Sequence, residues 1–168
     1  MPLAQLDKHT IIGLDWDDTF VGAGSSLRWC LPIQQYVTNH TNKEYHVVTF
    51  RNSNATKEIE LLVSTHPVLK TVVKSITHLP DSLREIQADA LCLGYIKQHS
   101  KTMFDKYYQD DPKEVDALLQ TYDAIITFKA RTCAKYSCTV MLDDMPNLVK
   151  EGCTRLGIEF VDSKTCYK

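Results

Sequence analysis

Two pairs of carboxylates stand at positions where a bound metal ion is expected. Asp15 and Asp17 follow one short apolar run, and Asp143 and Asp144 follow another. Carboxylates that converge closely cannot all remain ionised without a counter-cation. A divalent cation with oxygen ligands meets that need, and Mg²⁺ is the usual one where phosphate is also bound. The two pairs therefore predict a magnesium site.

Polar residues after two other apolar runs are suited to binding phosphate. Thr49 lies at the end of the second run with Arg51 just after it, and Lys129 follows a later run. A hydroxyl and an ammonium hold phosphoryl oxygens and neutralise developing charge, and Arg51 is a candidate for an anionic substrate group. Asp15 and Asp17 are two residues apart at a strand end, so their side chains start on the same side. One could attack phosphorus while the other exchanges protons with the leaving group.

The elements that must position these residues are short strands alternating with helices. Apolar, β-branched stretches predict strands over 11–14, 45–50, 124–128, 138–142 and 158–161. Helical spacing predicts helices over 27–40, 54–63 and 147–156, whereas 69–77 is compatible with either a strand or a helix. This alternation predicts an α/β fold with a parallel sheet covered on both faces. Ligands bind beyond the carboxyl ends of such strands, where the polar residues lie.

Length and composition favour one domain over residues 1–168. The chain has 168 residues, is 43% hydrophobic and has a net charge of −2, so no strong basic field favours nucleic acid or a membrane surface. No apolar run is long enough to span a membrane, and the N-terminus lacks a signal-peptide core. We therefore expect a cytoplasmic protein. Its six cysteines, with no CxxC pair, are expected to be reduced thiols rather than zinc ligands.

Taken in order along the chain, the polar residues resemble the four motifs of the haloacid dehalogenase (HAD) superfamily of phosphohydrolases. The matching residues are Asp15-x-Asp17-x-Thr19, then Thr49, then Lys129, then Asp143-Asp144. The resemblance covers about residues 9–53 and 122–162. It implies a three-layer, Rossmann-like parallel sheet with a small, mostly helical insertion. It also implies a Mg²⁺-dependent phosphomonoester hydrolase acting on a small-molecule phosphate ester.

The resemblance implies a role for each catalytic residue. Asp15 would be the nucleophile that forms an aspartyl-phosphate. Asp17 would be the general acid and then the base that activates water. Thr49 and Lys129 would bind the transferring phosphoryl group, with Lys135 as the alternative lysine.

The metal ligands also follow from the resemblance. Asp15, the backbone carbonyl of Asp17, and Asp143 would hold Mg²⁺, and Asp144 could share or take over the role of Asp143. The glycine that usually precedes this last motif is replaced here by Leu142.

Substrate choice in this superfamily usually depends on a cap insertion. The segment between the first two strands is short, so we expect a helical insertion or small cap at 54–121. If 69–77 is a strand, the insertion follows it and fits the family better. Residues 96–108 interleave bases and aromatics, which suits either nucleobase stacking or an amphipathic helix with a solvated lysine face. The stretch 142–146 is loosely similar to the deoxyribonucleotidase branch, so the expected substrate is a nucleotide monophosphate.

Other readings remain open at this stage. The response-regulator receiver domain has similar parts, but its acidic pair, lone Asp and Lys follow a different order. A polynucleotide end-phosphatase and a catalytically silent HAD-fold binding or regulatory protein are the alternatives in function. The physiological substrate, the oligomeric state and the choices between Lys129 and Lys135 and between Asp143 and Asp144 are not determined by the sequence.

Overall fold

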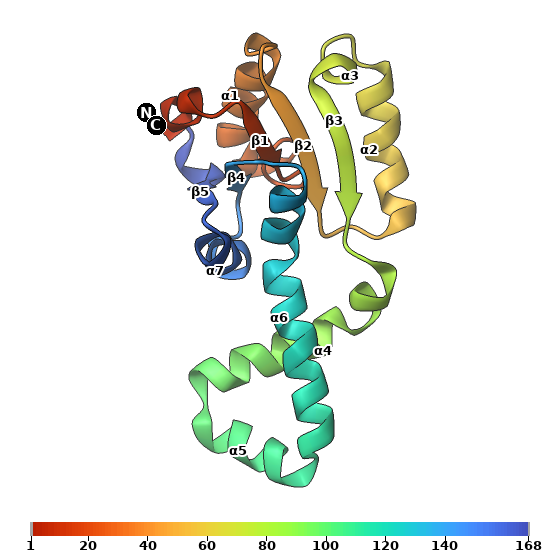
Figure 1. Ribbon diagram of the computed structural model, residues 1–168, viewed down its shortest axis with the longest axis vertical. Coiled ribbons are helices and arrows are strands. Elements are labelled where there is room, and N and C mark those ends of the chain that lie inside the picture. Colours follow the sequence, from red (N-terminus) through yellow and green to blue (C-terminus); the bar gives the residue numbers. More distant parts are fainter. Residues whose placement is uncertain (1, 168) are drawn as a thin grey trace.

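A five-stranded parallel sheet forms the centre of the molecule (Figure 1). The computed structural model describes residues 2–167. The strands lie in the order β3-β2-β1-β4-β5, with bounds β1 Ile11–Leu14, β2 Glu44–Thr49, β3 Val73–His78, β4 Val140–Asp143 and β5 Glu159–Asp162. The α-helices are α1 Leu27–Asn39, α2 Ser53–Thr65, α3 Leu69–Val72, α4 Asp81–His99, α5 Lys101–Asp110, α6 Pro112–Lys135 and α7 Pro146–Leu156. Short 3₁₀ helices η1, η2 and η3 cover Pro2–Lys8, Gly24–Ser26 and Ser163–Thr165.

Helices cover both faces of the sheet, which gives three Rossmann-like layers. Ile12 and Leu14 of β1 point into a core shared with α1 and α2. Val48 of β2 and Met141 of β4 point the opposite way, into a core shared with α6 and α7. Successive strand residues face opposite sides, so each central strand buries both of its faces. The predicted α/β class with a doubly covered parallel sheet is confirmed.

Helix α6 lies very close to the middle of the sheet. A Cβ atom placed on Gly13 of β1 would lie 2.5 Å from the Sγ atom of Cys133 on α6 and 2.8 Å from the Sδ atom of Met141. Real Cβ atoms do not approach other atoms so closely, so a larger residue at this position would have to displace the two sulfur-containing side chains. The close approach lets a side chain on α6 reach the ends of the central strands.

The prediction of a strand over 124–128 is wrong, because these residues belong to α6. Residues 125–130 are all buried, so the apolar run reflects a helix enclosed on every side. A short, fully apolar run does not distinguish such a helix from a buried strand. The third parallel strand in the chain is instead β3, which resolves the ambiguity at 69–77 as a short helix followed by a strand.

The expected insertion at 54–121 begins later than predicted. Residues 53–78 form α2, α3 and β3, and Ile59 and Val63 of α2 lie in the core. The helices that leave the sheet start at Asp81, so the insertion follows β3. We call residues 81–122, which comprise α4, α5 and the first part of α6, the helical arm. Figure 1 shows the arm extending from the edge of the sheet toward which the arrowheads of β2 and β3 point.

The remaining predicted helices agree with α1, α2 and α7 to within a few residues. Asn52 caps α2 by accepting a hydrogen bond from the Ala55 amide, so the helix begins at Ser53, one residue before the predicted start at 54. Helix α7 ends at Gly157, whose φ of 71° is left-handed. Within residues 2–167, no helix combines the length and apolarity needed to cross a membrane.

Candidate functional site

Three charged side chains from distant parts of the chain meet at the carboxyl edge of the sheet. Asp15 directly follows β1, and Asp143 ends the neighbouring strand β4, in a register that pairs Leu14 with Leu142. Lys129 reaches them from α6. Its Nζ atom lies 2.7 Å from Oδ1 of Asp15 and 2.5 Å from Oδ2 of Asp143. The lysine is only 1% exposed, so this is a buried, doubly paired ammonium.

The surroundings of Lys129 keep it charged. Burial alone would lower its pKa, but Asp15 and Asp143 outweigh burial and raise the pKa above its usual value. The ring of Phe50 adds a cation–π contact, with its centroid 4.4 Å from Nζ. Lys135, the other candidate lysine, is exposed at the end of α6 and lies over the ring of Tyr136 instead.

Two buried hydroxyls complete the environment of Asp15. Thr19 donates from Oγ1 to the second carboxylate oxygen of Asp15 at 3.0 Å, and its Oγ1 lies 3.2 Å from Oγ of Ser163. Thr19 matches the motif by sequence but was assigned no role, and Ser163 was missed. Ser163 directly follows β5, so applying the strand-end rule to the fifth strand would have identified it.

The carboxylates at this edge fit a hard divalent cation. Oxygen atoms of Asp15, Asp143 and Asp144 lie within 4.8 Å of one another. Burial, with the two neighbouring carboxylates, outweighs Lys129 and raises the pKa of Asp15 to about 7. Burial and Asp143 likewise raise the pKa of Asp144. Three carboxylates facing one ammonium retain excess negative charge, and their all-oxygen donor set suits Mg²⁺.

Asp17 and Arg51 pair with each other rather than joining this cluster. Arg51 donates from Nε and Nη2 to the two carboxylate oxygens of Asp17, at 2.8 and 2.6 Å. It also donates to Glu58 at 3.2 Å, and its backbone amide donates to Oγ1 of the buried Thr49 at 3.1 Å. The predicted metal role of Asp17 is through its backbone carbonyl, whereas its side chain is held by arginine.

A pocket of about 400 Å³ lies between the arm and the start of α7. Its polar and aromatic lining includes Tyr95, Gln98 and His99 of α4, Tyr122 of α6 and Asn147 of α7, and no Lys, Arg, Asp or Glu lines it. Tyr122 is seven residues before Lys129 on the same helix. Seven residues bring a side chain back to the same helix face about 10 Å further along the axis. The pocket and the buried ammonium therefore lie along one face of α6.

Comparisons of this chain with protein-family models, with curated proteins and with solved structures find no match.

Proposed function

We propose that this protein is a Mg²⁺-dependent phosphomonoesterase of the HAD superfamily, with a small helical cap. The observation that carries the proposal is the buried Lys129 ammonium between Asp15 and Asp143, at 2.7 and 2.5 Å. Burying an ion pair costs considerable desolvation energy, so such an arrangement is weak evidence for stability alone. Titratable groups whose pKa values are strongly shifted at the carboxyl edge of a parallel sheet are characteristic of a functional site.

The side chains that the proposed chemistry requires all come from this edge of the sheet. A carboxylate oxygen of Asp15 attacks phosphorus, the P–O ester bond breaks, and the leaving oxygen takes a proton from Asp17. Water then attacks the aspartyl-phosphate, its proton passes to Asp17, and Asp15 and inorganic phosphate are released. Lys129 and the Thr49 hydroxyl stabilise the negative phosphoryl oxygens throughout. When bound, Mg²⁺ supplies positive charge that keeps the carboxylates ionised and offsets the charge of the phosphate.

Arg51 has two partners in this scheme. In the structure it holds both carboxylate oxygens of Asp17 in a bidentate ion pair. An incoming phosphate dianion competes for the guanidinium, so Arg51 would move to the substrate and release the Asp17 side chain for proton transfer with the leaving group. The sequence prediction of a phosphate-binding Arg51 is retained in this form.

The pocket beside α7 supports a nucleoside monophosphate as substrate. Tyr95 and His99 offer flat faces, with their ring centroids 4.3 Å apart, and Gln98 and Asn147 offer hydrogen-bonding groups. Such a lining suits a planar, uncharged leaving group with polar edges. Its position about 10 Å from Lys129 along α6 is within reach of a nucleoside attached to the phosphate.

The nucleophile provides the direct test. We expect Asp15→Asn to abolish Mg²⁺-dependent hydrolysis of p-nitrophenyl phosphate and of nucleoside monophosphates, because an amide cannot form the aspartyl-phosphate. Asp18→Asn is the matched control. It makes the same change in the same loop at an exposed position whose φ of 54° suits asparagine, and it should retain activity. If the wild-type protein with Mg²⁺ hydrolyses nothing in a panel of nucleotides, sugar phosphates and DNA 3′-phosphate ends, the enzyme proposal fails.

One observation favours a second candidate, a binding protein that uses the same site without turnover. Asp17, which would act as the acid, is already engaged in a bidentate ion pair with Arg51. For this candidate, Mg²⁺ and inorganic phosphate would raise the melting temperature while the panel of esters remained intact. Turnover that depends on Asp15 would exclude it.

A further inference from the structure

The distal part of the arm contains a groove that the proposed reaction does not use. It has a volume of about 400 Å³ and lies between α4, α5 and the start of α6. Leu93, Ile96, Val115 and Leu118 give it an apolar floor. Helix α5 forms one wall, and within the described chain it contributes no buried residue, with Tyr107 49% exposed. The groove is therefore an apolar surface that the arm itself leaves uncovered.

The charged residues that line this groove are all acidic. They are Asp89, Asp110, Asp111 and Glu114, and none of them forms an ion pair within residues 2–167. Asp110 lies in the last turn of α5, a turn without a basic residue, where the helix dipole disfavours a carboxylate. Asp111 caps α6 by accepting a hydrogen bond from the Glu114 amide, so the negative charge that no cation pairs with in residues 2–167 comes chiefly from Asp89, Asp110 and Glu114.

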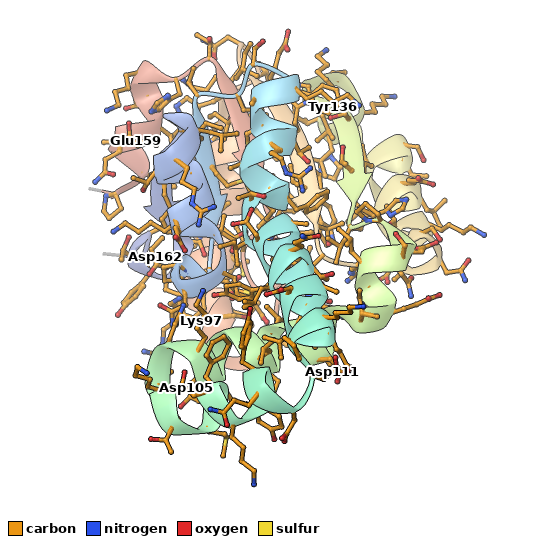
Figure 2. All side chains as sticks on the ribbon, turned by 60° about the horizontal axis from the view of Figure 1, so that its bottom comes forward. Lys97, Asp105, Asp111, Tyr136, Glu159 and Asp162 are labelled. Atoms are coloured by element: carbon orange, nitrogen blue, oxygen red, sulfur yellow. The ribbon has the colours of Figure 1, made fainter. Side chains whose placement is uncertain are left out.

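Lys97 of α4 and Lys101 of α5 are engaged outside the groove. Lys97 does not line the groove, and its Nζ lies 5.9 Å from the ring centroid of Phe104. Lys101 pairs with Asp105 at 2.6 Å. In Figure 2 the arm comes forward, with Lys97 and Asp105 toward one side and Asp111 at the start of α6 on the other. Among the described residues, no Lys or Arg lines the groove, so its carboxylates have no cation beside them in the lining.

We propose that this groove binds a basic amphipathic helix of a partner protein. Apolar side chains at helical spacing would fill the floor formed by Leu93, Ile96 and Leu118, and flanking Lys or Arg residues would pair with Asp89, Asp110 and Glu114. The apolar floor and the acidic side chains together favour a ligand that is both apolar and basic. An apolar helix leaves the carboxylates unpaired, and a simple polycation leaves the apolar floor exposed.

Cys92 provides a reporter within the groove. It is exposed and lines the groove, whereas the other five cysteines are buried. Its rate of alkylation by iodoacetamide therefore reports occupancy at this place. The probe is a synthetic helical peptide with leucine at positions i, i+3, i+4 and i+7 and lysine elsewhere. We expect a saturating amount of this peptide to slow Cys92 alkylation several-fold, and fluorescence anisotropy of labelled peptide to give its Kd.

The charge of the groove is tested with matched variants. Asp89→Asn, Asp110→Asn and Glu114→Gln together should raise the Kd about tenfold and remove most of the protection at a peptide concentration close to the wild-type Kd. Glu60→Gln, Glu85→Gln and Asp116→Asn make the same change in net charge at exposed positions outside the groove, and should leave both unchanged. A peptide with glutamate in place of lysine tests the same charge dependence without altering the protein. Its result therefore holds even if a protein variant is misfolded.

The outcomes separate the possible occupants. Absence of protection in the wild-type protein, or equal weakening in the two sets of variants, would overturn the proposal. Protection by spermine at the same charge concentration would identify a small polycation as the occupant, which also contradicts it. None of these measurements depends on hydrolysis, so the result is independent of the proposed function.

Discussion

The Lys129 ammonium is central both to the proposed chemistry of the site and to the free energy of folding of the charged residues around it. Lys129 pairs with Asp15 and Asp143 in surroundings that exclude water. Removing Lys129 would leave Asp15 and Asp143 as uncompensated buried charges, which typically costs about 3–5 kcal/mol. Lys129 is therefore poorly replaceable for structural reasons as well, and loss of activity in a Lys129 variant alone does not distinguish its two roles.

The raised pKa of Asp15 predicts how stability depends on pH. Its pKa is about 7 in the folded chain and 3.8 for a free side chain, so the folded state binds more protons between these values. The free energy of unfolding should therefore decrease as pH rises from about 4 to about 7, by up to about 4 kcal/mol, and level off above. Urea denaturation in EDTA measures this.

The contribution of Asp15 is isolated by difference. Asp15→Asn cannot lose the proton, so the decrease in its free energy of unfolding over this pH range should be smaller than in the wild type. Asp18→Asn should follow the wild type. Identical pH profiles for Asp15→Asn and wild type would show that Asp15 does not titrate in this range.

At the scale of elements, strand ends were the most informative part of the sequence. Asp15, Thr49 and Asp143 each stand at the end of a strand whose apolar run was recognisable, and the structure has those strands. Lys129 was identified from a run that is in fact helical. A fully buried helix and a strand both require continuous apolar residues, so local pattern could not separate them. Lys129 was nevertheless identified, because it stands between Thr49 and Asp143 in the order of the four motifs, although its helix was predicted as a strand.

The sequence did not predict which side chains of distant elements pair with one another. Nothing in the local pattern indicates that Arg51 turns to Asp17, because both ends of that pair depend on the bend that follows each strand. The same holds for the contact between Thr19 and Ser163, which joins residues 144 positions apart.

The packing of α6 against α7 depends on Gly152. A Cβ atom there would lie 2.4 Å from the carbonyl oxygen of Ile126 and 3.0 Å from the Cα atom of Thr127, both of them backbone atoms that cannot rotate away. Gly152→Ala should therefore push the helices apart and lower the free energy of unfolding by about 1–3 kcal/mol. Chemical denaturation measures the loss.

A nearby substitution controls for general effects on α7. Lys150→Ala changes an exposed residue of the same helix and should alter stability by less than about 0.5 kcal/mol. If Gly152→Ala is as stable as Lys150→Ala, the two helices have more freedom to separate than the close packing indicates.

At the scale of the whole molecule, the arm and the sheet differ in how well they are buried. Helix α5 contributes no buried residue within the described chain, whereas α6 is buried at every position over 125–130. Local opening is least costly where few apolar contacts are lost. The end of the arm should therefore open without unfolding of the sheet.

Hydrogen exchange measures this difference. Amides of α5 should exchange at least about tenfold faster than those of α2, a surface helix of similar length that buries Ile59 and Val63. Amides over 125–130 should be the most protected of the three. Equal protection in α5 and α2 would mean that the arm is held by contacts beyond those in the isolated chain.

Because α6 is one uninterrupted helix of 24 residues, it sets the angular phase between the arm and the site. Each added residue turns the preceding part of the helix by 100° and moves it by 1.5 Å. Because the arm is also joined to β3 through α4, a single insertion between Val115 and Ile125 would put the first turns of α6 out of register with α4, whereas seven inserted residues would nearly restore the facing of the side chains. Changes in length are therefore expected to be tolerated better at the breaks near Ser100 and Asp111 than within α6.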